Sequence, residues 1–111
     1  MQERTNPRYN AKGHASIDGV LEGEVMLKNL SITGCCLECK TYDNIKPNEK
    51  YIIDVKPESS VGVGKFDLEV ECRWIHKRDC FCEIGFQIIA SPKGKSFQSY
   101  VDYLAYNSTL V

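Results

Sequence analysis

Residues 66–76 read FDLEVECRWIH and decide the fold, because apolar and polar side chains alternate along them. A period of two is typical of a strand with one buried and one exposed face. Residues 80–90, CFCEIGFQIIA, repeat the alternation, and the three residues KRD between the two runs predict a hairpin. In this pattern Trp74 and His76 continue the buried face of the first strand.

Further strands are expected at residues 50–57 and, shorter, at 14–17, 22–30 and 35–40, with Asp18-Gly19 as a tight turn. Six short strands separated by turn signals at intervals of about 8–12 residues are typical of small all-β folds. The sequence therefore predicts a six-stranded antiparallel β-barrel.

The period changes near the end of the chain, where Phe97, Tyr100, Val101 and Leu104 are spaced i, i+3, i+4 and i+7. This spacing predicts an amphipathic α-helix packed on the barrel, with Ser96 as its N-cap.

The charge balance limits the partners. The chain has 111 residues, with 14 Lys and Arg against 15 Asp and Glu, which fits one domain and excludes a broad basic field for nucleic acid or membranes. An anionic ligand must therefore meet a local cluster of cations. The first residues lack the apolar run of a secretory signal, and no run is long enough to span a membrane. We expect a cytoplasmic monomer.

Six cysteines raise the alternative of a zinc or thiol module, since the chain contains Cys36-x-x-Cys39 and Cys80-x-Cys82. On a strand, however, positions 36 and 39 face opposite sides, and Cys72 lies on an apolar face, as does Cys82. We expect free thiols and no metal.

The two histidines, His14 and His76, have no serine or carboxylate partners at a recognisable spacing. We therefore expect no catalytic residues and no cofactor, and we do not expect an enzyme.

Two polar segments are candidates for binding. Arg4 and Arg8 precede the strands, and in an extended arm they point the same way about 13 Å apart, which suits the two ends of an anion. Asn29 and Ser31 offer an amide and a hydroxyl on one side of a strand, and Gly34 allows a tight turn or a close approach of ligand to backbone. Taken singly, solvated arginines and a simple serine turn are the plainer readings of these segments.

Together, Arg4-x-x-x-Arg8 and Asn29-x-Ser31-x-x-Gly34 resemble the two-part motif of the PilZ domain family, RxxxR followed by [D/N]xSxxG. The resemblance implies a six-stranded barrel with a C-terminal helix and a bacterial receptor for cyclic di-GMP. Arg4 and Arg8 would hold the guanine Hoogsteen edges and the phosphates. Asn29 and Ser31 would read the remaining polar edge of guanine, and Gly34 would keep the turn open beneath the ligand.

The resemblance also implies an organisation: residues 1–12 as a flexible arm, 13–92 as the barrel, and 93–111 as the helix and tail. We hypothesise that the arm is disordered when free, closes over cyclic di-GMP and presents a new surface to an effector protein. The neutral amide of Asn29 should hold guanine N–H groups less tightly than the alternative carboxylate.

The alternatives are a degenerate PilZ-like adaptor that binds protein but no nucleotide, and a barrel for single-stranded nucleic acid, which the net charge of −1 disfavours.

Overall fold

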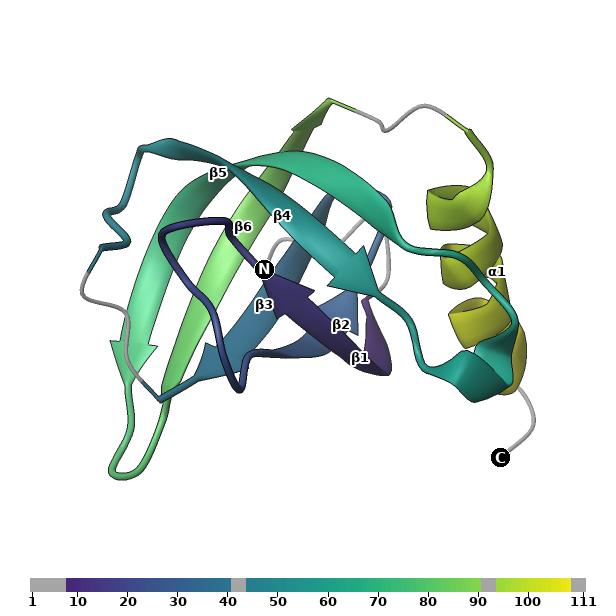
Figure 1. The fold of residues 1–111 in the computed structure, drawn as a ribbon, viewed down its shortest axis with the longest axis horizontal. Helices are drawn as coiled ribbons and strands as arrows, with labels where there is room; N and C mark the ends of the chain where they lie inside the picture. Colours follow the sequence, from purple (N-terminus) through teal and green to yellow (C-terminus); the bar gives the residue numbers. More distant parts are fainter. Residues whose placement is uncertain (1–7, 41–43, 91–93, 109–111) are drawn as a thin grey trace, which may run out of the picture.

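The chain forms a closed barrel of six antiparallel strands followed by one helix, as the computed structural model shows for residues 8–40, 44–90 and 94–108 (Figure 1). The strands run in the order β1-β2-β3-β6-β5-β4 around the barrel. Their bounds are β1 Tyr9–Ser16, β2 Met26–Leu30, β3 Gly34–Cys39, β4 Lys50–Lys56, β5 Phe66–Lys77 and β6 Cys82–Ala90. The predicted six-stranded antiparallel barrel is confirmed.

Side chains fill the interior of the barrel. Every strand contributes apolar residues, and those with no exposed surface include Leu30, Leu37, Ile53, Leu68 and Ile84. A barrel of this size has an interior just wide enough for side chains. The buried thiols of Cys72 and Cys82 belong to this core, as predicted, so these cysteines act as small apolar residues.

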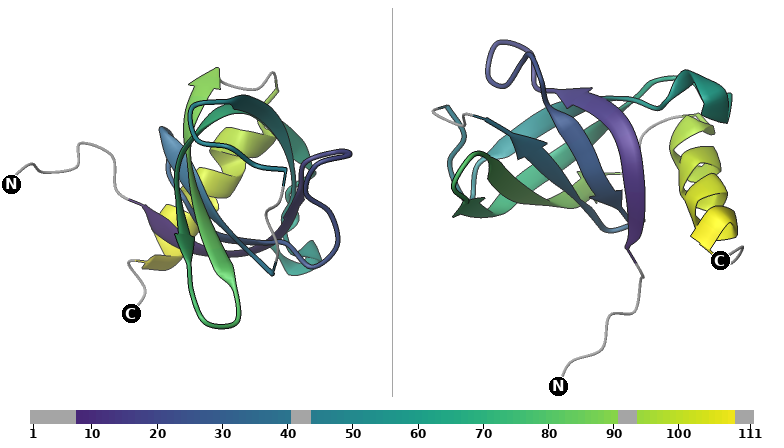
Figure 2. Two further views of the ribbon diagram at one scale, coloured as in Figure 1. Left: turned by 90° about the vertical axis from the view of Figure 1, so that its left-hand side faces the viewer. Right: turned by 90° about the horizontal axis from the view of Figure 1, so that it is seen from below.

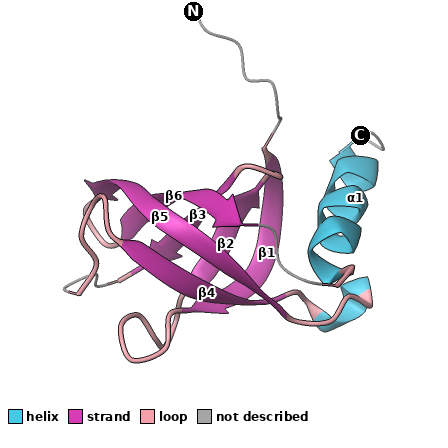
Figure 3. Ribbon diagram, turned by 90° about the horizontal axis from the view of Figure 1, so that it is seen from above, coloured by secondary structure: helices cyan, strands magenta, loops and turns pink. Residues whose placement is uncertain are grey.

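Helix α1, Ser96–Ser108, covers one end of the barrel beside β1 (Figures 2 and 3). Its buried residues are the predicted Phe97, Tyr100, Val101 and Leu104. The centroid of the Phe66 ring on β5 lies 5.6 Å from the ring centroid of Phe97 and 6.1 Å from that of Tyr100. Ser96, predicted as the N-cap, is instead the first residue of the helix. No helix in the described part of the chain is long and apolar enough to cross a membrane.

Strand β1 begins five residues earlier than the predicted strand at 14–17. Residues 9–12, which the sequence assigned to the flexible arm, therefore belong to the barrel and pair with β2. A register shift between Asn10 and Gly13 breaks the period of two here, which hides the strand in the sequence. Of the rest of the predicted arm, residues 1–7 lie outside the described residues.

The predicted burial of Trp74 and His76 is wrong. A register shift between Cys72 and Trp74 in the pairing of β5 with β6 changes which face the following residues present. Cys72 is fully buried, whereas Trp74 is half-buried and His76 is exposed. The bulge thus moves an aromatic side chain from the core to the outer surface.

The packing of α1 predicts an asymmetry between two aromatic residues on the helix. Phe97→Ala should reduce the free energy of unfolding by about 3–5 kcal/mol, because it empties a site packed against Phe66. The matched change Tyr103→Ala, at a side chain that is 37% exposed, should cost less than about 0.5 kcal/mol. Urea denaturation monitored by circular dichroism measures both, and equal costs would contradict a helix docked through Phe97.

Candidate functional site

The structure brings together the predicted site residues that it describes. Arg8 immediately precedes β1, and the first pairs between β1 and β2 are Tyr9 with Leu30 and Asn10 with Asn29. This register places Arg8 beside the turn that joins β2 to β3. Arg4 lies outside the described residues, so its predicted contact remains a prediction.

The Arg8 guanidinium lies close to Gly34. A Cβ atom added at Gly34 would lie 3.1 Å from Nη2 of Arg8 and 2.8 Å from the backbone oxygen of Phe86. The second distance is too short for a real Cβ contact, and a backbone oxygen cannot move aside easily. Glycine is therefore required here by space, because Arg8 and the β6 backbone both approach the start of β3.

Ser31 is buried and closes the turn. Its Oγ accepts hydrogen bonds from the backbone N–H groups of Thr33 (3.2 Å) and Gly34 (3.0 Å), while its own N–H donates to the Gly34 carbonyl (2.8 Å). Its side chain is thus committed to the turn, the plainer of the two roles considered from the sequence. The contact with guanine stays a prediction for Ser31.

Asn29 carries a buried acceptor that lacks a partner. Its Oδ1 has no hydrogen bond to any described residue, although it is shielded from solvent. Leaving a buried polar atom unpaired costs about 1–3 kcal/mol, so such atoms in native proteins call for an explanation. A ligand N–H group would satisfy the acceptor.

A row of paired residues extends from Asn29 across the outside of the barrel. Asn29 pairs with Cys36 on β3, Cys36 with Gly85 on β6, and Gly85 with Trp74 on β5. Three strand spacings span about 14 Å. A Cβ atom at Gly85 would overlap the Trp74 ring, so glycine allows the indole to lie flat on the sheet.

Trp74, which the alternation in the sequence assigns to the core, is the half-buried aromatic member of this row. Its ring also lies 4.5 Å from the His76 ring, at an interplanar angle of 32°. The sequence signal was Gly85, a glycine inside a strand, which often marks the close approach of another group.

Cations gather beside this row despite the net charge of −1. Glu83 is buried and forms ion pairs with Lys28 of β2 and with Arg78, whose Nε and Nη2 both lie 2.9 Å from its Oε1. Hydrogen bonds from Lys28 and Arg78 lower the pKa of Glu83. With Arg8, three cations lie near this row against two carboxylates, those of Glu83 and of its cross-strand neighbour Glu38, which leaves a small local excess of positive charge.

The cysteines do not form a shared site on β3. Both Cys36 and Cys39 are buried, but Cys39 packs in the interior cluster, whereas Cys36 lies outside that cluster, between Asn29 and Gly85 in the row described above. Burial raises the pKa of Cys35 to about 12 and that of Cys39 to about 11, so both are protonated at neutral pH. No group of His, Cys, Asp or Glu among residues 8–40, 44–90 and 94–108 is arranged to hold a metal ion.

Comparisons with known proteins agree with this geometry. The family model of the PilZ domain matches residues 2–105. A solved structure of the Bacillus subtilis inhibitor of motility, MotI/DgrA, superimposes with a TM-score of 0.77 at 14% sequence identity and covers 99% of this chain. The present chain spans about half of that protein, 53% of its length. A search of curated proteins finds no match.

The ion pairs of Glu83 predict a pH-dependent stability. Because the folded state lowers the pKa of Glu83 below the ordinary value of 4.5, its contribution is complete above that value and is lost as the pH falls through the folded pKa. At pH 7 Glu83→Gln should lower the free energy of unfolding by about 1 kcal/mol, and the difference from wild type should vanish in acid. Urea titrations from pH 7 to pH 3 measure this difference. Glu71→Gln is the control and should have little effect, because the Glu71 side chain is more exposed than that of Glu83 and has an ion pair with Arg73 alone among the described residues. A gap that persists in acid would contradict the ion-pair origin.

The contact of Trp74 with Gly85 gives a second prediction. Gly85→Ala should destabilise the barrel by about 1–3 kcal/mol and shift the emission of the chain's single tryptophan to the red, because the ring must leave the sheet. In a Trp74→Ala background the same change should cost less than about 0.5 kcal/mol. Gly64→Ala, where a Cβ meets only ordinary contacts, is the control. Equal costs in both backgrounds would show that the indole is not the obstacle.

Proposed function

The chain belongs to the PilZ domain family, and from this premise we propose that it is a cytoplasmic bacterial receptor for cyclic di-GMP whose occupied form signals to an effector protein. The family is a binding domain, and the proposed role is recognition without catalysis. The observation that carries the proposal is the unpartnered, buried Oδ1 of Asn29, close in sequence to the Gly34 turn that the Arg8 guanidinium approaches.

Guanine complements Asn29. Its N1–H and N2–H groups are donors, and the Asn29 Oδ1 is an acceptor already removed from water. Binding therefore gives an unsatisfied acceptor a hydrogen bond. The desolvation cost of that acceptor is already included in the free energy of folding and does not oppose binding. A ligand without a donor at this point gains nothing from the Asn29 Oδ1.

Arg8 complements the rest of the ligand. A guanidinium presents a planar fork of donors that matches a phosphate or the O6 and N7 edge of guanine. Arg8 lies close to Gly34 at the start of β3, which supports a binding position for this end of the RxxxR motif on the barrel itself. On this proposal only the segment that carries Arg4 has to close, which limits the entropy lost on binding.

Ser31 and Trp74 have supporting roles in this proposal. Ser31 holds the β2–β3 turn in the shape that presents Gly34 to the ligand. The half-buried Trp74 ring offers an aromatic face for base stacking at the far end of the row. A span of about 14 Å from Asn29 to Trp74 is of the size of a dinucleotide.

Calorimetric titration with cyclic di-GMP tests the proposal. Arg8→Ala should weaken binding by about 1–3 kcal/mol, a factor of about 5 to 150, while the control Lys65→Ala should leave the affinity unchanged. Asn29→Leu should weaken binding without lowering stability, because it removes an unsatisfied polar atom, and Asn29→Asp should tighten binding.

Two results would contradict this assignment. If folded wild-type protein gives no heat of binding when it is titrated with cyclic di-GMP, the alternative is favoured, an adaptor of the PilZ family that binds no nucleotide. Unchanged affinity of both Arg8→Ala and Asn29→Leu would mean that the nucleotide binds elsewhere.

A further inference from the structure

Strand β4 has an open edge at the seam of the barrel. β4 pairs with β5 from Lys50 to Val55, but on its other side it pairs with β1 only through Asp54, Val55 and Lys56. β1 ends at Ser16, and the chain then turns back on itself between Ile17 and Leu21. The first half of β4 therefore has no paired strand on that side among the described residues.

The register identifies the backbone groups that are free. The Cys72 N–H donates to the Glu49 carbonyl, so in β4 the odd-numbered residues face β5. Lys50 and Ile52 consequently direct their N–H and C=O groups toward the seam, in line with Asp54, which pairs there with Ser16. Neither Lys50 nor Ile52 has a backbone partner at the seam among the described residues.

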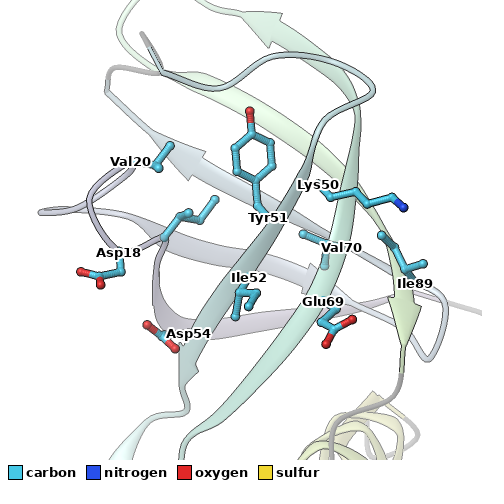
Figure 4. A pocket seen from close by; sticks show the side chains of 10 residues that line it. Asp18, Val20, Lys50, Tyr51, Ile52, Asp54, Glu69, Val70 and Ile89 are labelled. Carbon is cyan, nitrogen blue, oxygen red and sulfur yellow. The ribbon is translucent and has the colours of Figure 1, made fainter.

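A hollow of about 640 Å³ lies along this edge (Figure 4). Ile17, Val20 and Tyr51 line it on the side of the core, and Ile52 and Ile89 line it at the surface. The last two are 54% and 47% exposed, which places them among the most exposed large apolar residues of the described chain. The hollow thus offers apolar contact directly beside free hydrogen-bonding groups.

The charge around the hollow is negative. Carboxylates of Asp18, Asp54 and Glu69 line it with a single ammonium, that of Lys50, and Figure 4 places Asp54 and Glu69 on either side of Ile52. None of these three carboxylates has an ion pair with a described basic side chain. Asp67 faces Asp54 from β5 and, with burial and Asp18, raises the pKa of Asp54, while Lys65 offsets this only in part.

We propose that this seam binds an extended segment of a partner protein by strand addition to residues 50–53 of β4, the segment carrying lysine or arginine alternately with aliphatic residues. Main-chain hydrogen bonds to Lys50 and Ile52 supply affinity, and the period of two directs aliphatic side chains into the hollow and cations toward Asp54 and Glu69. The inference goes beyond the proposed function, because none of the residues proposed to bind nucleotide lines the seam.

The test uses 15N-labelled protein without nucleotide and the peptide acetyl-KVKVKVK-amide as a probe. The amides of Lys50 and Ile52 should shift on titration, and their hydrogen exchange should slow by at least about tenfold at saturation, since they gain partners. Binding should weaken as salt rises. The peptide EVEVEVE, and the KV peptide with alternate backbone nitrogens methylated, should not bind.

A pair of variants links binding to the hollow. Ile52→Lys should weaken KV-peptide binding at least about tenfold, because it removes the apolar contact and adds a like charge. Met26→Lys, at an exposed apolar residue on β2, is the matched control and should bind as wild type does.

Three outcomes would overturn the proposal: no slowing of exchange at Lys50 and Ile52, equal binding of the acidic peptide, or equal loss in both variants. Protection of the same amides that rises with protein concentration alone would also overturn it, because the occupant would then be a second copy of this chain. None of these outcomes depends on binding of cyclic di-GMP.

Discussion

Closure of a six-stranded sheet is the constraint on which the molecule depends. A closed sheet of this size has room inside only for its own side chains, and buried residues such as Leu30, Leu37 and Ile84 use that room. Recognition is therefore confined to the outer face and to places where the pairing of strands is incomplete. The row from Asn29 to Trp74 is of the first kind and the seam beside Ile52 is of the second, so both candidate surfaces follow from the same restriction.

Alternation in the sequence predicts this fold wherever the pleat is regular. The hairpin of β5 and β6 and the apolar stripe of α1 follow directly from periods of two and of 3.6. The errors coincide with register shifts. The shift between Asn10 and Gly13 conceals the first half of β1, and the shift between Cys72 and Trp74 turns the tryptophan outward. An extra residue in a strand leaves no local signature in composition, so only the pairing of distant strands reveals it.

The sequence predicts that Arg8 and the β2–β3 turn lie near each other, but it does not predict which polar atoms of the turn are already hydrogen-bonded. The spacing of Asn29, Ser31 and Gly34 singles out the turn, and Arg8 is found against it. The sequence could not distinguish the hydroxyl of Ser31, which the turn consumes, from the amide of Asn29, whose oxygen stays unpaired. That difference depends on where β2 ends, since Asn29 is still in the strand and Ser31 is one residue beyond it. Boundaries of elements are the least predictable feature of a sequence, and here one boundary separates an unpaired acceptor from a hydroxyl that the turn uses.

The junction of β1 with β4 has a consequence for how the chain folds. It joins residues 14–16 to residues 54–56 through three pairs, so a long loop must be closed for a small return in hydrogen bonds. The hairpin of β5 and β6, in contrast, joins neighbours in sequence over a long ladder. Contacts between distant segments form late when few interactions reward them. The sheet is therefore expected to assemble first as an open curved ribbon. It becomes a cylinder only in its last step, when β1, the strand that follows Arg8, docks onto β4.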